Sequence, residues 1–147
     1  MALLSSRRTL VLSIAASLLA AGTATAGWFR SAPADLDLSL AKSSEAGAYL
    51  VQIAPETEPV TVGPMHAWTV SLRTADGNPV DAATIAIDGG MPRHGHGLPT
   101  APAVTRTLGD GRFLVEGMKF NMPGWWEIEL TIDGPAGRDS ATFNLML

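Results

Sequence analysis

The 147-residue sequence contains no cysteine. This absence excludes disulfides, iron–sulfur clusters, zinc sites with thiolate ligands and blue-copper centres, because each of these needs at least one cysteine. Any metal ion bound by this chain must therefore be held by histidine, methionine or carboxylate side chains.

Two further absences limit the possible functions. Basic residues number 10 against 14 acidic ones, a formal net charge of −4, so the basic surface that nucleic-acid binding needs is not expected. The chain also lacks a Gly-x-Ser-x-Gly nucleophile motif, a His-Glu-x-x-His zinc motif and a recognisable pair of catalytic carboxylates. We therefore expect a protein that is not an enzyme and does not bind nucleic acid.

The first 26 residues have the pattern of a secretory signal peptide. Arg7 and Arg8 precede an uncharged apolar stretch at residues 10–21, and the small residues Ala24-Thr25-Ala26 form a cleavage site before Gly27. We expect cleavage after Ala26 and a periplasmic protein. Cleavage removes two arginines and no acidic residue, which changes the formal charge from −4 to −6.

Two alternatives for the N-terminus stay open. Residues 9–26 form an uncharged run of 18 residues, which is near the lower length limit for a membrane-spanning anchor. The paired arginines also fit loosely a twin-arginine signal, which exports folded proteins. If cleavage occurs, no membrane span remains in the mature chain.

The rest of the chain predicts an all-β domain. After a flexible lead-in at residues 27–34, one domain is expected over residues 35–147, because short stretches of alternating apolar and polar residues are separated by Gly, Pro, Asp and Asn. Seven or eight strands at this spacing favour an immunoglobulin-like two-sheet β-sandwich, with a small closed barrel as the alternative. The expected strands lie near residues 36–40, 49–53, 66–72, 85–87, 104–108, 112–118, 126–132 and 141–147.

Two details of this pattern can be checked in a structure. Trp126 alternates in phase with apolar residues, so we expect it to be buried opposite Trp68 on a facing strand, whereas Trp125 should lie on the outer face. The segment at residues 89–102 contains four Gly and three Pro and predicts a long irregular loop. Long loops on compact β scaffolds are often functional.

Histidine and methionine cluster in three short stretches: 65–66, 91–97 and 118–122. Imidazole suits copper, zinc, nickel and iron, whereas thioether sulfur selects copper(I), so this combination in a chain without cysteine points first to copper. We predict that His94 and His96 bind copper, with Met91 and Met122 as soft ligands. The glycine between the two histidines can take a positive φ that lets their rings converge.

For His66 and Met118, a structural role is an alternative to metal binding. His66 is in phase with Trp68, so it is either a further metal ligand or a hydrogen-bonded histidine at the edge of the core. Met118 fits a core-filling role better than a ligand role, and core filling is also the alternative for Met122, which flanks the same apolar turn. In the competing interpretation, the His-Gly-His loop has only a structural role.

The motifs also resemble a known family. The Met-Pro-Arg-His-Gly-His segment from Met91, the Gly-Asp-Gly-Arg-Phe segment from Gly109 and the Phe-Asn-Met-Pro-Gly-Trp-Trp segment from Phe120 together resemble the YtkA-like group, which is related to FixH-like proteins. The resemblance covers about residues 35–147 and implies a small exported or membrane-anchored immunoglobulin-like domain. The apparent cleavage site is a departure from FixH-like proteins.

The functional implications of this resemblance are broader. Some members are associated with copper handling or respiratory oxidase assembly, which implies a copper-receiving or respiratory-assembly protein as partner. A few relatives are labelled auxin-binding proteins, which makes a small-ligand-binding or protein-interaction module the alternative function.

Overall fold

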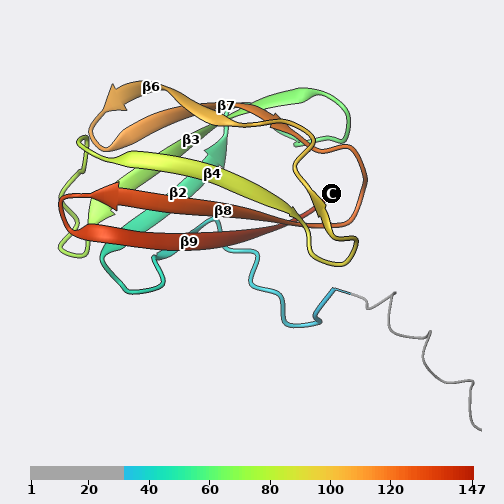
Figure 1. Cartoon of the computed structure of the whole chain (residues 1–147), viewed down its shortest axis with the longest axis horizontal. Helices are drawn as coiled ribbons and strands as arrows, with labels where there is room; N and C mark the ends of the chain where they lie inside the picture. The colour runs from blue at the N-terminus through green and yellow to red at the C-terminus, as the bar shows by residue number, and fades with distance from the viewer. Residues whose placement is uncertain (1–31) are drawn as a thin grey trace, which may run out of the picture.

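The computed structural model describes residues 32–147, which form nine β-strands and, within that range, no helix (Figure 1). The strands are β1 Ala41–Ser43, β2 Tyr49–Pro55, β3 Met65–Thr74, β4 Thr84–Met91, β5 His96–Gly97, β6 Ala103–Gly109, β7 Arg112–Lys119, β8 Trp125–Gly134 and β9 Gly137–Met146. The predicted all-β fold is confirmed.

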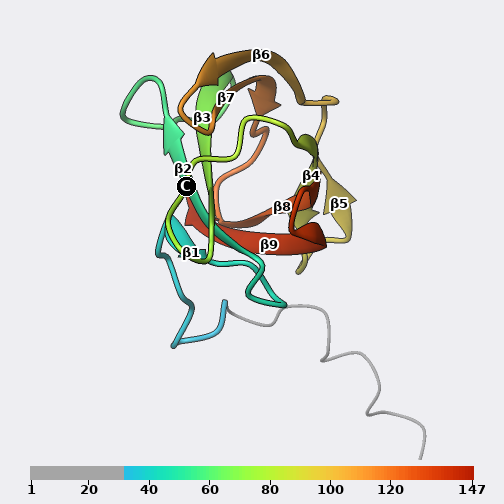
Figure 2. The ribbon, with the colours of Figure 1, turned by 90° about the vertical axis from the view of Figure 1, so that its left-hand side faces the viewer.

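The strands pair in the order β1-β2-β3-β7-β6-β4-β8-β9, with β5 added to β4, and every pairing is antiparallel. Between β6 and β4 the pairing consists of one residue pair, Ala86 with Ala103, so the sheet folds there into two facing layers. The two ends of this strand order also meet, because the Glu45 amide in the turn between β1 and β2 donates a hydrogen bond to the Ser140 carbonyl on β9 at 2.8 Å. The predicted two-sheet sandwich is confirmed, and these links give it a nearly barrel-like cross-section (Figure 2).

The core lies between the two layers. Trp68 on β3 and Trp126 on β8 are 2% and 0% exposed, which confirms that both are buried on facing strands. Trp126 packs edge-to-face on Phe120 at a centroid distance of 5.3 Å. Trp125 lies on the outer face, as predicted, where its Nε1 donates to the Asn144 side chain at 2.9 Å.

The first strand begins later than predicted. The alternating leucines at residues 36–40 predicted a strand there, but the Ser39 amide donates to Asp37 Oδ1 at 2.9 Å and forms a local turn. Asp37 also pairs with Lys42 at 2.7 Å. The strand β1 therefore starts only at Ala41. The hydrogen bond that the Asp37 side chain accepts from the Ser39 amide favours a turn here, although the alternating leucines indicated a strand.

The segment at residues 89–102 is more regular than predicted. The strand β4 continues to Met91, and β5 returns beside it with the pairs Gly90–Gly97 and Met91–His96. The chain thus makes a tight hairpin before the irregular stretch that leads to β6. Glycine-rich composition obscured this hairpin because two of its four paired residues carry no side chain to show alternation.

The predicted signal peptide and residues 27–31 of the predicted lead-in lie outside the described residues. Within residues 32–147, no helix has the length and apolar character needed to cross a membrane.

Candidate functional site

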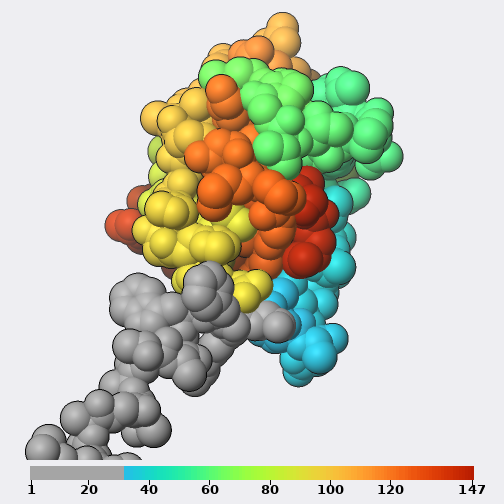
Figure 3. Space-filling view, turned by 90° about the vertical axis from the view of Figure 1, so that its right-hand side faces the viewer, coloured from blue at the N-terminus to red at the C-terminus, as the bar shows by residue number. Residues whose placement is uncertain are grey.

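The histidines and methionines of the described chain gather at one end of the sandwich. The strands β3 and β8 begin at this end, while β4, β7 and β9 finish there. Figure 3 shows this end, with the β4–β5 turn in yellow beside the β7–β8 loop in orange. We call it the histidine–methionine end; its members are Met65, His66, Met91, His94, His96, Met118, Met122 and Met146.

Antiparallel pairing brings these residues together from distant parts of the sequence. Met65 and His66 pair with Lys119 and Met118 at the last residues of β7. Met146, which stands apart from the three sequence clusters, pairs with Trp125 at the first residue of β8. The sequence shows three stretches rich in His and Met, and the strand pairing adds Met146 to the same end of the molecule.

The β4–β5 turn has a well-defined backbone. The Met91 carbonyl accepts hydrogen bonds from the amides of His94 and Gly95, both at 3.0 Å. Gly95 has φ +62°, and a Cβ there would meet nothing within 4 Å, so conformation rather than space favours glycine. The predicted positive φ between His94 and His96 is thus confirmed.

Close backbone packing holds the base of this turn. A Cβ on Gly90 would stand 2.1 Å from the His96 carbonyl oxygen, and one on Gly89 would stand 2.2 Å from the Glu127 carbonyl oxygen. A side chain on Gly90 would push β5 away from β4, and one on Gly89 would push β4 away from β8. The glycines therefore set the place of His96 relative to the sheet.

His94 and His96 are both exposed, with ring centroids 6.1 Å apart and planes inclined by 13°. Among residues 32–147, neither ring takes part in a hydrogen bond. Two imidazoles on one metal ion have centroids roughly 5 to 6 Å apart, given metal–nitrogen bonds of about 2 Å. The two rings are stacked, and because both are exposed, side-chain rotation can turn their nitrogens toward one ion.

The histidine pair is not part of a larger group of metal-ligating side chains among the described residues. Within the part of the chain that the structure describes, no group of three or more His, Asp or Glu side chains has the geometry to hold a metal ion. Glu127 is the acidic residue opposite Gly90 in the β4–β8 ladder. Burial, and secondarily the charge of Glu129, raises the pKa of the Glu127 carboxyl. Sequence reasoning gave no signal for Glu127, because only the strand register places it beside the hairpin.

The two predicted thioether ligands pack in or against the core. Met91 is only 2% exposed, and its Cε lies close to Gly124, where an added Cβ would be 3.1 Å away. Met122 is partly buried against the core, and its carbonyl accepts a hydrogen bond from Trp126 Nε1 at 3.0 Å. Both methionines belong to the same end as the histidine pair, but each has packing contacts of its own.

His66 stands on the other layer and has partners. Its Nε2 lies 2.8 Å from the Thr61 carbonyl oxygen, and its ring centroid is 6.1 Å from that of Phe120. The contact with Thr61 fixes the loop between β2 and β3, and the contact with Phe120 holds the ring against the core. Met118, which pairs with His66, is 1% exposed and packs in the core as predicted.

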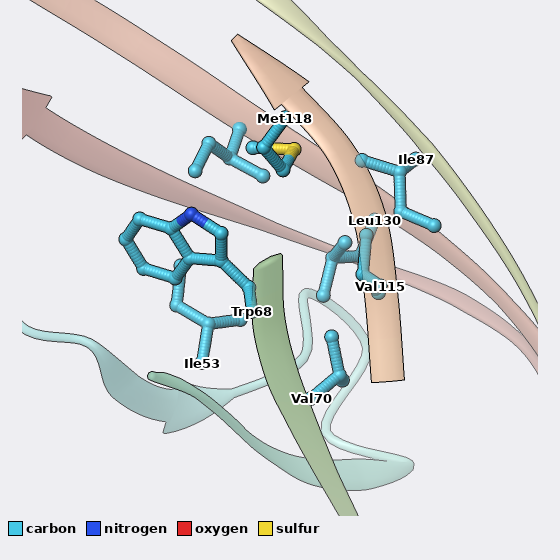
Figure 4. A pocket seen from close by; sticks show the side chains of 8 residues that line it. Ile53, Trp68, Val70, Ile87, Val115, Met118 and Leu130 are labelled. Carbon is cyan, nitrogen blue, oxygen red and sulfur yellow. The ribbon is translucent and has the colours of Figure 1, made fainter. Parts of the chain in front are cut away.

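The interior offers little room for an organic ligand. A cavity of about 10 Å³ lies between the layers, bordered by Trp68, Met118 and aliphatic side chains (Figure 4). This volume is about the minimum for one water molecule. Two open grooves of about 400 and 410 Å³ lie on the outer face of β1–β3 and between β4 and β6, and neither is lined by histidine or methionine.

Comparison with known proteins gives one match. The model of the YtkA-like family matches residues 43–131, which is more than half of the chain. No curated protein and no solved structure matched the sequence. The matched range includes the His94–His96 hairpin and the Met122 loop.

Proposed function

This chain belongs to the YtkA-like family, and from that premise we propose that it is an exported, non-enzymatic protein that carries or buffers copper. The ion binds at His94 and His96 on the β4–β5 hairpin. The observation that carries this proposal is the exposed, nearly parallel imidazole pair with centroids 6.1 Å apart. A copper-receiving or respiratory-assembly protein is the proposed partner, and the periplasm the proposed location.

The chemistry of the surrounding residues favours copper over zinc. Protein zinc sites take three or four nitrogen, sulfur or oxygen ligands from His, Cys, Asp or Glu. The described residues provide no such set of three. Thioether groups are instead concentrated at this end, and thioethers select copper(I) among the common metal ions. Met91, Met122 and His66 are the predicted candidates for a further ligand.

The competing small-ligand function has less support. A pocket for a drug-sized organic molecule usually encloses about 300 to 1,000 Å³. The cavity between the layers is about 10 Å³, so a ligand the size of an auxin does not fit there. The two grooves of about 400 and 410 Å³ reach that range, but they are open to solvent and do not enclose a ligand. An interaction module in which the hairpin is purely structural predicts that the histidines contribute to apo stability and not to metal binding.

Copper titration of the mature protein tests the proposal. We expect the wild type to bind copper with micromolar or tighter affinity, and the His94→Ala/His96→Ala double variant to lose this binding. Copper should also stabilise the wild type by about 2.7 kcal/mol at a free concentration one hundred times the dissociation constant. Millimolar affinity for both oxidation states, with no thermal shift, would contradict the proposal.

Export is tested separately. Mass spectrometry of the periplasmic fraction should find Gly27 as the N-terminal residue, because Ala24 and Ala26 occupy the small-residue positions before the cut. Intact Met1 in the membrane fraction would instead identify residues 9–26 as an anchor.

A further inference from the structure

We propose that the open groove on the outer face of β1–β3 binds an extended acidic segment of a partner protein, with its carboxylates on Arg73 and Arg112 and an apolar side chain on Leu50. The groove has a volume of about 400 Å³ and is lined by no histidine or methionine. It belongs to the layer that faces β4 and β8, so it is separate from the β4–β5 hairpin (Figure 2). Binding there goes beyond the proposed copper-binding function and does not depend on it.

Small side chains on the outer face of β1–β3 produce the groove. The strand pairing places the outward-facing side chains in rows across the three strands. The two rows that line the groove are Ala41–Gln52–Ser71 and Ser43–Leu50–Arg73. Half of these side chains are alanine or serine, so the face is hollowed between the longer side chains of Gln52, Leu50 and Arg73.

The charge of these strands is opposite to that of the other layer. The strands β1, β2 and β3 contain Lys42 and Arg73 and no acidic residue. In contrast, β4 and β8 contain no basic residue and four acidic ones, which are Asp88, Glu127, Glu129 and Asp133. A groove lined by charge of one sign concentrates ligands of the opposite charge. A basic groove on a chain with a net charge of −4 therefore favours an acidic ligand.

The Arg73 side chain is held in place and keeps donors for a ligand. Its Nη1 donates to the Gly77 carbonyl at 3.1 Å, and its Nη2 lies 3.3 Å from Asp110 Oδ2. A guanidinium has five N–H donors and can bind a carboxylate through two of them. The Arg73 and Asp110 side chains are 41% and 64% exposed, and an ion pair so exposed contributes little to stability. A carboxylate of the partner can thus replace Asp110 at little cost.

Arg112 provides a second guanidinium beside the groove. It is exposed and pairs with Ser71 in the β3–β7 ladder, which makes it the diagonal neighbour of Arg73. Diagonal neighbours in a sheet lie about 7 to 8 Å apart, and alternate side chains of an extended segment repeat at about 6.6 Å. Two carboxylates separated by one residue therefore match the two arginines.

The open shape of the groove favours a segment of a protein over a free small molecule. Small-molecule sites usually bury most of the ligand surface, whereas this groove is open to solvent. A segment that belongs to a partner protein is covered on its outer side by its own protein. Leu50 is 40% exposed and pairs with Arg73 in the β2–β3 ladder, so it offers an apolar contact next to the charged one.

Backbone-amide NMR of the isotope-labelled mature protein tests this docking surface with the peptide Ser-Glu-Ser-Glu-Ser-Leu-Ser as the probe. We expect saturable shifts for amides of β1, β2, β3 and the first residues of β7. The same peptide with Gln in place of Glu should bind at least about tenfold more weakly, because its side chains carry no charge for the arginines.

Two arginine variants locate the contact. Arg73→Glu should weaken binding of the peptide at least about tenfold, because it replaces attraction by repulsion between like charges. Arg138→Glu makes the same charge change at an exposed position of β9 on the other layer. It should stay within about twofold of wild type at about 0.15 M salt, where distant surface charges are screened. If Arg73→Glu does not fold, Arg73→Gln removes the charge and keeps hydrogen-bond donors.

Each result decides the proposal. Saturable shifts on β1–β3 that are lost in the Arg73 variant and kept in Arg138→Glu would support it. Absence of saturable shifts, shifts on β4 and β8 instead, or equal weakening by the two variants would overturn it. Binding of the Gln peptide as tightly as the Glu peptide would also overturn it. Displacement of the peptide by an equal concentration of inorganic phosphate would show a site for a free anion and would overturn the assignment to a protein segment.

Discussion

The two ends of the sandwich use their polar side chains differently. At the end opposite the histidines, the Asp139 carboxylate accepts hydrogen bonds from the amides of Ala46 and Ala48 at 3.0 and 3.1 Å. It thereby fastens the β1–β2 turn to β9. At the histidine–methionine end, His94 and His96 are exposed and have no hydrogen-bond partner for their rings among residues 32–147.

Tyr49 gives the opposite end a second fastening. Its buried ring places the hydroxyl at the β8–β9 turn, where it donates to the Gly137 carbonyl at 2.7 Å and accepts from the Ala136 amide at 3.1 Å. The polar groups of this end are thus satisfied by structural contacts. The comparison teaches that, within the described residues, no such contact holds the His94 and His96 rings, and binding a ligand is the role that we propose for them.

The largest expected loss of stability comes from a change in the core beneath the histidine–methionine end. Trp126→Ala should lower the free energy of unfolding by about 3 to 5 kcal/mol, because it removes a fully buried aromatic side chain. Trp125→Ala, on the outer face, is the matched control and should cost clearly less. Chemical denaturation of both variants measures the difference, and equal losses would contradict the assigned faces of β8.

Removal of the Tyr49 hydroxyl should destabilise the end opposite the histidines. Tyr49→Phe keeps the ring but leaves the Ala136 amide and Gly137 carbonyl without the hydroxyl, so we expect a loss of about 1 to 3 kcal/mol. Denaturation with urea gives the value. A neutral result would mean that water replaces the hydroxyl, and the ends would then differ less than the contacts indicate.

A smaller effect on stability, seen only at acidic pH, should come from the Asp139 carboxyl. Hydrogen bonds from the Ser44 side chain first, and then from backbone amides, lower the pKa of Asp139 to about 2. Because the folded pKa lies below the unfolded one, the carboxylate stabilises the fold above pH ~4 and that contribution is lost as the pH falls toward 2. Thermal melts between pH 5 and 2 should show a flatter acid limb for Asp139→Asn than for wild type, and identical limbs would contradict this.

The smallest change in stability should come from replacing the histidine pair. Replacing His94 and His96 by Ala in the apo protein should change the free energy of unfolding by no more than about 0.5 kcal/mol, since both rings are exposed. The same denaturation assay used for Tyr49→Phe measures it. A loss of 1 kcal/mol or more for each histidine would give the two ends the same structural character and favour the interaction-module interpretation.

Periodicity predicted much of the fold correctly because each layer has one buried face. Trp126 and Trp68 were assigned to the core from alternation alone. The start of β1 and the β4–β5 hairpin were not predicted. In the first case the Asp37 side chain satisfies a nearby amide, and in the second the paired Gly90 and Gly97 have no side chains to alternate.

The sequence by itself determined the all-β class, the buried faces of the strands and the pairing of two histidines across one glycine, because these depend on residues close together in the chain. Only the tertiary structure decided which residues share an end. Antiparallel pairing set Met146 beside Trp125, buried Met91 against Gly124 and engaged His66 with Thr61. Those outcomes depend on strand order and register, which arise from packing two layers together and which no local pattern specifies.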